Sequence, residues 1–138
     1  MLLDLRNLTK SYVTSEGPLE VLKGVSLTLA AGHSLALTGE SGSGKSTLLQ
    51  LVAGLDTPDM GEIRLEDRNI VGLGDAALAQ VRRDTVGLIF QQFNLIPSLD
   101  VAAKLAFHAR LAGRHDGGWV RVLAERLGLA AFLSRYPE

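Results

Sequence analysis

Hydrophobic and polar residues alternate with a two-residue period near the start of the chain. The alternation is clearest in residues 3–8, 19–22 and 25–29, which are separated by polar or glycine-containing stretches. A period of two places successive side chains on opposite faces of a sheet. The pattern therefore predicts three strands, each with one buried face, and residues 62–65 are a further strand candidate.

Two other segments are apolar almost throughout. Residues 34–38 read Ser-Leu-Ala-Leu-Thr, and residues 86–90 read Val-Gly-Leu-Ile-Phe. Short continuous apolar runs are typical of strands that are covered on both faces, as in a parallel sheet. We therefore expect both segments to be buried strands.

The remaining apolar positions follow the spacing of amphipathic helices. Leu48, Leu51, Val52 and Leu55 fall at i, i+3, i+4 and i+7, which predicts a helix from residue 45 to residue 53. Strands that alternate with helices indicate the α/β class. Further helices are expected from Asp75 as cap, from Ser98 or Asp100 to Ala112, over 119–127, and as a turn within 130–136.

Composition excludes several classes of protein. The 138 residues contain no cysteine, which rules out disulfides and cysteine-ligated metal sites. The 14 Lys and Arg residues against 15 Asp and Glu argue against a dedicated nucleic-acid binder. No apolar run is long enough to span a bilayer, and Met1 is not followed by a secretory signal. We expect a cytoplasmic domain.

Residues 39–46 read Gly-Glu-Ser-Gly-Ser-Gly-Lys-Ser and match the phosphate-loop pattern G-x-x-x-x-G-K-[ST]. Glycines let successive N–H groups point into one concavity, and the following helix adds partial positive charge. The contributing residues are expected to be Gly39, Glu40, Ser41, Gly42, Ser43, Gly44, Lys45 for the β and γ phosphates, Ser46 for Mg²⁺, and Thr47 for the α-phosphate.

The surroundings of the motif support a nucleotide site over a plain glycine-serine turn. A candidate buried strand precedes it and an amphipathic helix follows it, as the motif requires. Glu40 places a carboxylate in an anion-binding loop, so we expect this side chain to face water. The loop alone is compatible with kinases, GTPases, helicases and transporter ATPases.

Four stretches narrow this choice. They are residues 8–12 (LTKSY), 21–27, 39–63 and 87–99 (GLIFQQFNLIPSL). Together they resemble the ATP-binding subunit of ABC transporters, in the branch that serves lipoprotein release, macrolide export and cell division. The resemblance extends over nearly the whole chain and is densest up to Leu99. It implies the P-loop NTPase core of ABC type.

The resemblance implies roles for residues outside the phosphate loop. Tyr12 matches the aromatic residue that stacks on adenine. An ordinary tyrosine at the end of a strand, without a role in binding, would give the same sequence pattern. Gln91 matches the glutamine that reaches Mg²⁺ or the attacking water, and Gln92 is the second choice for that role. The ligands implied are ATP and Mg²⁺, with Ser46 and Gln91 at the metal.

The resemblance also implies domains and partners. Residues 1–97 would form a partial nucleotide-binding core with an antiparallel β part, and residues 98–138 the start of the helical subdomain. The whole protein would pair head to tail with a second ATP-binding subunit on a membrane permease, at the inner face of the membrane and without nucleic acid. The apolar residues Phe93, Leu95 and Ile96 would either face the permease or pack inside the subdomain.

Parts that phosphoryl transfer to water requires are absent from the sequence. An apolar strand ending in paired acids would hold Mg²⁺, but the only such candidate, residues 63–67, is interrupted by Arg64. No LSGGQ-like signature follows. We therefore expect full-length family members to hydrolyse ATP and this chain alone to do so little or not at all. Without further strands, residues 34–38 and 86–90 would lie at open edges and lower the stability of the chain.

Three alternatives stay open at this stage. An ABC-type ATPase could work without a membrane partner. A small P-loop kinase would need a basic lid and an acceptor pocket. A fragment without enzymatic activity could bind nucleotide or regulate assembly.

Overall fold

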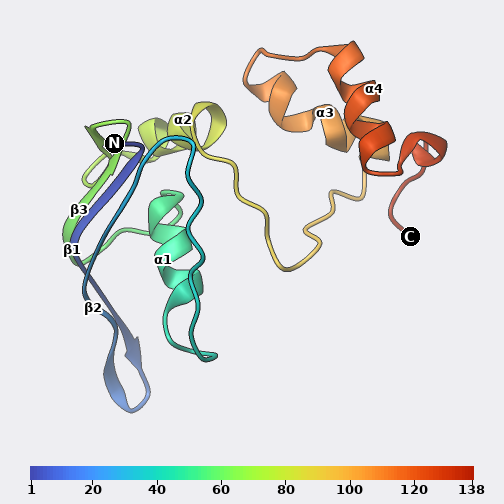
Figure 1. The fold of residues 1–138 in the computed structure, drawn as a ribbon. Helices are drawn as coiled ribbons and strands as arrows, with labels where there is room; N and C mark the ends of the chain where they lie inside the picture. The colour runs from blue at the N-terminus through green and yellow to red at the C-terminus, as the bar shows by residue number, and fades with distance from the viewer. The chain divides into compact units, whose positions relative to one another are not determined.

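The computed structural model describes residues 1–138, which form two compact units, Met1–Arg82 and Arg83–Glu138. The strands and helices can be followed along the chain in Figure 1. They are β1 (Leu3–Thr14), β2 (Gly17–Leu29), α1 (Lys45–Val52), β3 (Met60–Leu65), β4 (Arg68–Asn69), α2 (Asp75–Asp84), α3 (Val101–Leu111), α4 (Gly117–Arg126) and the 3₁₀ turn η1 (Ala130–Phe132).

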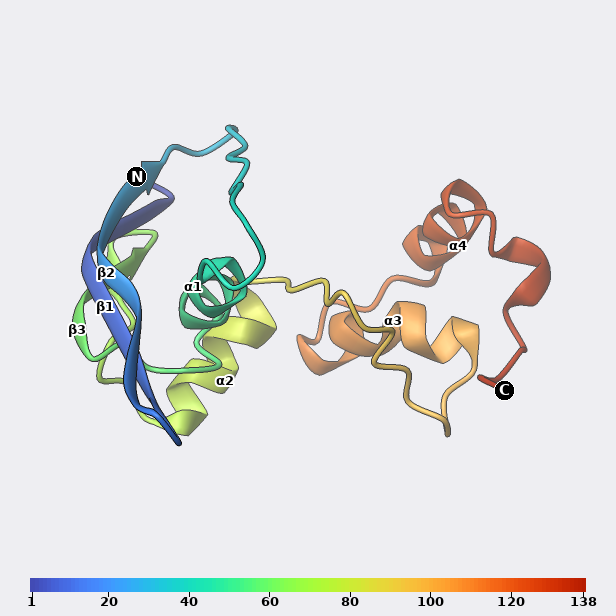
Figure 2. The ribbon, with the colours of Figure 1, turned by 90° about the horizontal axis from the view of Figure 1, so that it is seen from below.

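The first unit is built on a four-stranded antiparallel sheet in the order β2-β1-β3-β4. Strand β1 is central, and its Leu5 lies opposite Leu27 of β2 and Ile63 of β3. Helices α1 and α2 both lie on one side of this sheet, as Figure 2 shows. One sheet face is therefore covered and the other is open.

The covered face carries the apolar positions of the alternating strands. Leu5, Leu8 and Ile63 are at most 1% exposed, and Leu51 of α1 is completely buried. Removing such side chains from water is the main contribution to the stability of a small unit like this one. The alternation expected for residues 3–8 and 25–29 is confirmed.

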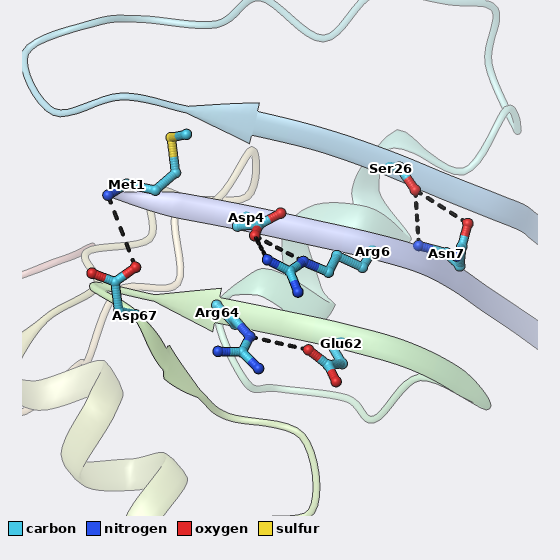
Figure 3. Close-up of polar contacts among 8 residues, drawn as sticks. All are labelled: Met1, Asp4, Arg6, Asn7, Ser26, Glu62, Arg64 and Asp67. Atoms are coloured by element: carbon cyan, nitrogen blue, oxygen red, sulfur yellow. Dashed lines mark hydrogen bonds and ion pairs between the residues drawn. The ribbon is translucent and has the colours of Figure 1, made fainter.

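The open face carries charged and polar side chains (Figure 3). The guanidinium of Arg6 donates to Asp4 at 2.7 Å, and that of Arg64 donates to Glu62 at 3.0 Å. The hydrogen bond to Asp4 raises the pKa of Arg6 above its ordinary value. Ion pairs at the surface contribute little to stability, so this face interacts mainly with water.

A bulge in the pairing of β1 with β3 brings the two backbones unusually close. Asn7 adopts a positive φ of 48°, and Gly61 on the neighbouring strand has a φ of 103°. A Cβ on Gly61 would lie 2.5 Å from the carbonyl oxygen of Arg6. Only glycine fits at this position without moving the sheet.

Four of the expected strands differ from the structure. Residues 19–22 and 25–29 are parts of one strand, because β2 stays paired with β1 across several register shifts. Residues 34–38 and 86–90 are not strands: no strand of the sheet pairs with them, and Leu35 and Ile89 are 54% and 97% exposed. An apolar segment becomes a strand only where a neighbour accepts its backbone hydrogen bonds.

The helical expectations agree more closely with the structure. Helix α1 ends at Val52, and Gly54 follows in the terminating turn with a φ of 66°. Asp100 caps α3 by accepting from the amide of Ala103 at 2.8 Å. Asp75 is the first residue of α2 rather than its cap, and the expected turn within 130–136 is limited to η1. The predicted domain boundary between residues 97 and 98 stays a prediction. None of the helices is long and apolar enough to cross a membrane.

Candidate nucleotide-binding site

The phosphate loop curls tightly before helix α1. Gly42 and Gly44 have φ values of 79° and 94°, and the amide of Ser43 donates to the carbonyl oxygen of Glu40 at 3.2 Å. Gly44 is the N-cap of α1, where a Cβ would lie 2.9 Å from a methyl group of Val21 in β2. The glycines of the motif are therefore required both by the turn and by the close approach of β2.

The start of α1 presents free donors. No side chain caps the helix, and the amides of residues 44–47 donate to no acceptor within the protein. The first amides of any helix lack intrahelical partners, and they lie at the positive end of the helix dipole. This helix start is therefore suited to hold an anion.

Lys45 places a full positive charge inside the curve of the loop. Its Nζ donates to the carbonyl oxygens of Gly39 at 2.8 Å and Glu40 at 2.5 Å, and to the hydroxyl of Ser43 at 3.2 Å. The Glu40 side chain is exposed and makes no ion pair with Lys45. The ammonium group is thus held by oxygens of the loop and is not neutralised by the carboxylate of the motif.

Tyr12 lies towards the end of β1 and is connected both to the start and to the end of α1. Its hydroxyl donates to the Oδ2 atom of Asp56 at 2.8 Å and also interacts with the side chain of Thr47. Partial burial and the bond to Asp56 raise the pKa of Tyr12, and the Thr47 interaction works against this. Tyr12 and the phosphate loop therefore belong to one connected cluster in the first unit.

Asp56 and Lys10 complete this cluster, and neither was predicted as a site residue. Lys10 donates to the Oδ1 atom of Asp56 at 3.1 Å, although 46 residues separate the two. Burial opposes ionisation of Asp56, but bonds from Tyr12, the Thr57 amide and Lys10 together lower its pKa. No local spacing rule links positions so far apart, so the pattern of residues along the chain does not predict this contact.

The predicted glutamines lie elsewhere. Gln91 and Gln92 belong to the second unit, in a stretch without helix or strand, and both are exposed. Neither side chain makes a hydrogen bond within the protein. The structure groups Tyr12 with the phosphate loop in the first unit, and the role of Gln91 at the nucleotide stays a prediction.

Comparison with known proteins decides the family. The profile of the family described as "ABC transporter" matches residues 22–138. The chain belongs to the ABC transporter family. The resemblance that residues 39–63 and 87–99 indicated is thus confirmed.

Curated relatives agree with this assignment. The ABC chain is 40% identical to the lipoprotein-releasing system ATP-binding protein LolD of Geobacter metallireducens, over 99% of this chain and 62% of that protein. It is 39% identical to the methionine import ATP-binding protein MetN of Caulobacter vibrioides, over 99% of this chain and 41% of that protein. It therefore spans about three-fifths of the length of LolD, and less of MetN.

A solved relative has the same fold. The ATP-binding cassette MJ0796, in a dimeric post-hydrolysis state bound to ADP and Pi, superposes with a TM-score of 0.86 at 35% identity. The match covers 98% of this ABC chain and 61% of that chain. The fold class expected from the sequence, the P-loop NTPase core of ABC type, is confirmed.

Proposed function

We propose that this chain is part of an ATP-binding subunit that couples ATP binding and hydrolysis to transport through a membrane permease. The observation that carries the proposal is the phosphate loop, whose oxygens hold the Lys45 ammonium and which leads directly into the free amides of residues 44–47. Such an arrangement of amides and one cation fits the phosphates of a nucleotide.

Binding would exchange the partners of Lys45. Its ammonium group now donates to neutral oxygens of the loop. Phosphate oxygens carry negative charge, whereas the carbonyl oxygens of the loop are neutral, so phosphate adds a direct attraction between opposite charges. The exchange therefore favours the β and γ phosphates of ATP, while the amides of residues 44–47 receive the remaining oxygens.

Ser46 fits a role at Mg²⁺. It is exposed at the start of α1, and its hydroxyl makes no hydrogen bond within the protein. A hydroxyl oxygen is the hard ligand that Mg²⁺ accepts, and no cluster of three or more acidic, histidine or cysteine residues offers another metal site. Mg²⁺ bound with the nucleotide would neutralise phosphate charge. Ser46 would contact it from the phosphate loop, and a contact from Gln91 is what the resemblance to the family implies.

Hydrolysis needs groups beyond this loop. Phosphoryl transfer to water requires a carboxylate at the metal and a group that orients the water. The nearest acid in the sequence, Glu40, is exposed and lies within the loop itself. We therefore expect this chain alone to bind ATP without appreciable turnover. The complete protein would act as a head-to-tail dimer with a second ATP-binding subunit.

The exposed apolar residues after Gln91 support a permease contact. Phe93 is 90% exposed, and Leu95 and Ile96 are also exposed in the second unit. Apolar side chains that gather on a surface are typical of an interaction site. This arrangement favours contact with a membrane partner over packing inside the subdomain, and it would place the protein peripherally on the cytoplasmic side of the membrane.

Titration with ATP and Mg²⁺ tests the phosphate-loop assignment. Lys45→Ala should weaken binding at least about tenfold, since a charge-assisted bond contributes about 1.5–3 kcal/mol. Lys23→Ala removes an exposed lysine from β2 and should leave affinity unchanged. Equal affinity of the Lys45→Ala variant and the unchanged chain would refute the assignment.

A further inference from the structure

A small polar cluster fixes Tyr12 from two directions. The hydroxyl of Tyr12 donates to one carboxylate oxygen of Asp56 at 2.8 Å. The other oxygen accepts from Lys10 at 3.1 Å and from the amide of Thr57 at 2.7 Å. Both oxygens of Asp56 are therefore engaged, which leaves the carboxylate little freedom to turn.

Lys10 covers one face of the tyrosine ring. Its Nζ lies over the Tyr12 ring at 5.1 Å from the centroid, and it is held there by Asp56 and by the carbonyl oxygen of Thr57 at 2.7 Å. A cation over an aromatic face is itself attractive. Tyr12 is 36% exposed as a residue, and Lys10 covers one face of its ring, so a planar ligand would have to approach the other face.

The segment that carries Asp56 is fastened to β1. Asp59 accepts from the amide of Ser11 at 2.6 Å, and its own amide donates to the carbonyl oxygen of Thr9 at 2.9 Å. Residues 56–59 follow α1, and α1 begins at the phosphate loop. The position of the Tyr12 ring is thereby coupled to the loop through one short, rigid helix.

We propose that Asp56 is a positioning residue for recognition of the nucleotide base. It holds the Tyr12 hydroxyl and Lys10 so that the ring presents its free face to a purine, and it makes no contact with the phosphates. This inference rests on the proposed function, because it assumes that the phosphate loop binds the triphosphate. Its own content is the division of labour between Asp56, which serves the base, and Lys45, which serves the phosphates.

Comparing two ligands separates these roles. ATP carries a base and a triphosphate, whereas inorganic tripolyphosphate carries only the phosphate chain. Both are titrated with Mg²⁺ into the chain and into Asp56→Ala. Base stacking on an aromatic residue contributes a factor of about five to a hundred. We expect Asp56→Ala to weaken ATP binding by about threefold to tenfold, a part of that factor, and to leave tripolyphosphate binding unchanged.

Two further variants keep the test decisive if Asp56→Ala folds poorly by circular dichroism. Tyr12→Phe removes the bonded hydroxyl but keeps the ring and the carboxylate, and should show the same selective loss for ATP. Asp56→Asn retains one acceptor oxygen and should recover part of the affinity. Tyr136→Phe, in the second unit, is the matched control and should bind both ligands like the unchanged chain.

The outcomes distinguish the inference from the proposed function. Equal loss of ATP and tripolyphosphate binding in Asp56→Ala and Tyr12→Phe would mean that the cluster only supports the loop, and would overturn the inference. No change in either ligand would overturn it as well. If the unchanged chain bound tripolyphosphate as tightly as ATP, the base would make no contact that adds affinity. That result would overturn the inference on Asp56 but leave the phosphate-loop assignment intact. Failure to bind either ligand would refute the proposed function itself.

Discussion

Arg82 donates a hydrogen bond of 2.6 Å from its Nη1 atom to the carbonyl oxygen of Gly54. Gly54 lies just beyond Ala53, the C-cap of α1, in the turn that ends the helix. The bond therefore gives the carbonyl of this turn a charged donor from α2. It links the two helices that cover the sheet.

Replacement of Arg82 by alanine should lower stability. A half-buried hydrogen bond to a charged group contributes about 1.5–3 kcal/mol, so we expect Arg82→Ala to lower the free energy of unfolding by about 1–2 kcal/mol. Urea titration followed by circular dichroism measures this. Arg83→Ala breaks only the exposed pair with Asp84 and should change little. Equal effects of the two variants would contradict the role of the Gly54 bond.

Gly61 should tolerate no side chain. Gly61→Ala would place a Cβ 2.5 Å from the carbonyl oxygen of Arg6, at a φ of 103° that alanine rarely adopts. We expect a loss of about 2 kcal/mol or more, measured by the same urea titration. Gly72→Ala is a matched control, since its φ is also positive but its Cβ meets nothing within 4 Å. A smaller loss for Gly61→Ala than for Gly72→Ala would disprove the close approach.

Asp56 should make stability depend on pH in the acid range. Its pKa in the folded chain lies below the ordinary value of 3.8, so ionised Asp56 favours the folded state above that value. The contribution disappears as the pH falls below 3.8 and through the lowered pKa. The stability difference between the unchanged chain and Asp56→Asn should therefore narrow on acidification, as measured by urea titrations from pH 6 to about pH 2. A constant difference would exclude the ionised pair.

Hydrogen exchange should distinguish residues 34–38 and 86–90 from the sheet. Their amides donate to no acceptor within the protein, so they should exchange without protection. Amides of β1 that pair with both neighbours, such as that of Leu5, are the internal reference. Protection of either segment at the level of β1 would show that it has a partner in solution, for example in a second copy of the chain.

Local patterns accounted for the helices, the alternating strands and the phosphate loop. The α1 helix and its cap at Gly44 follow from a motif of eight successive residues, and Asp100 caps α3 through a bond three residues away. The strands expected at residues 34–38 and 86–90 depended on partners that the sheet lacks. Apolar character alone sets no partner, so sequence could not decide these two segments.

The candidate site was likewise predictable only in part. Loop residues 39–47 were identified because their chemistry is contiguous, whereas Tyr12 meets Asp56 across 44 residues. Such a contact depends on the register between β1 and the segment after α1, which no single stretch of sequence encodes. Resemblance to a family pointed to Tyr12, but it offered nothing on what orients the ring.

The bonds of Lys45 to its own loop have a consequence for affinity. Hydrogen bonds from the Lys45 ammonium group to oxygens of the loop stabilise its curved conformation without a ligand. A preorganised receptor loses little conformational entropy on association. It also discriminates by charge, because a singly charged anion such as chloride attracts the Lys45 ammonium less than a multiply charged triphosphate does.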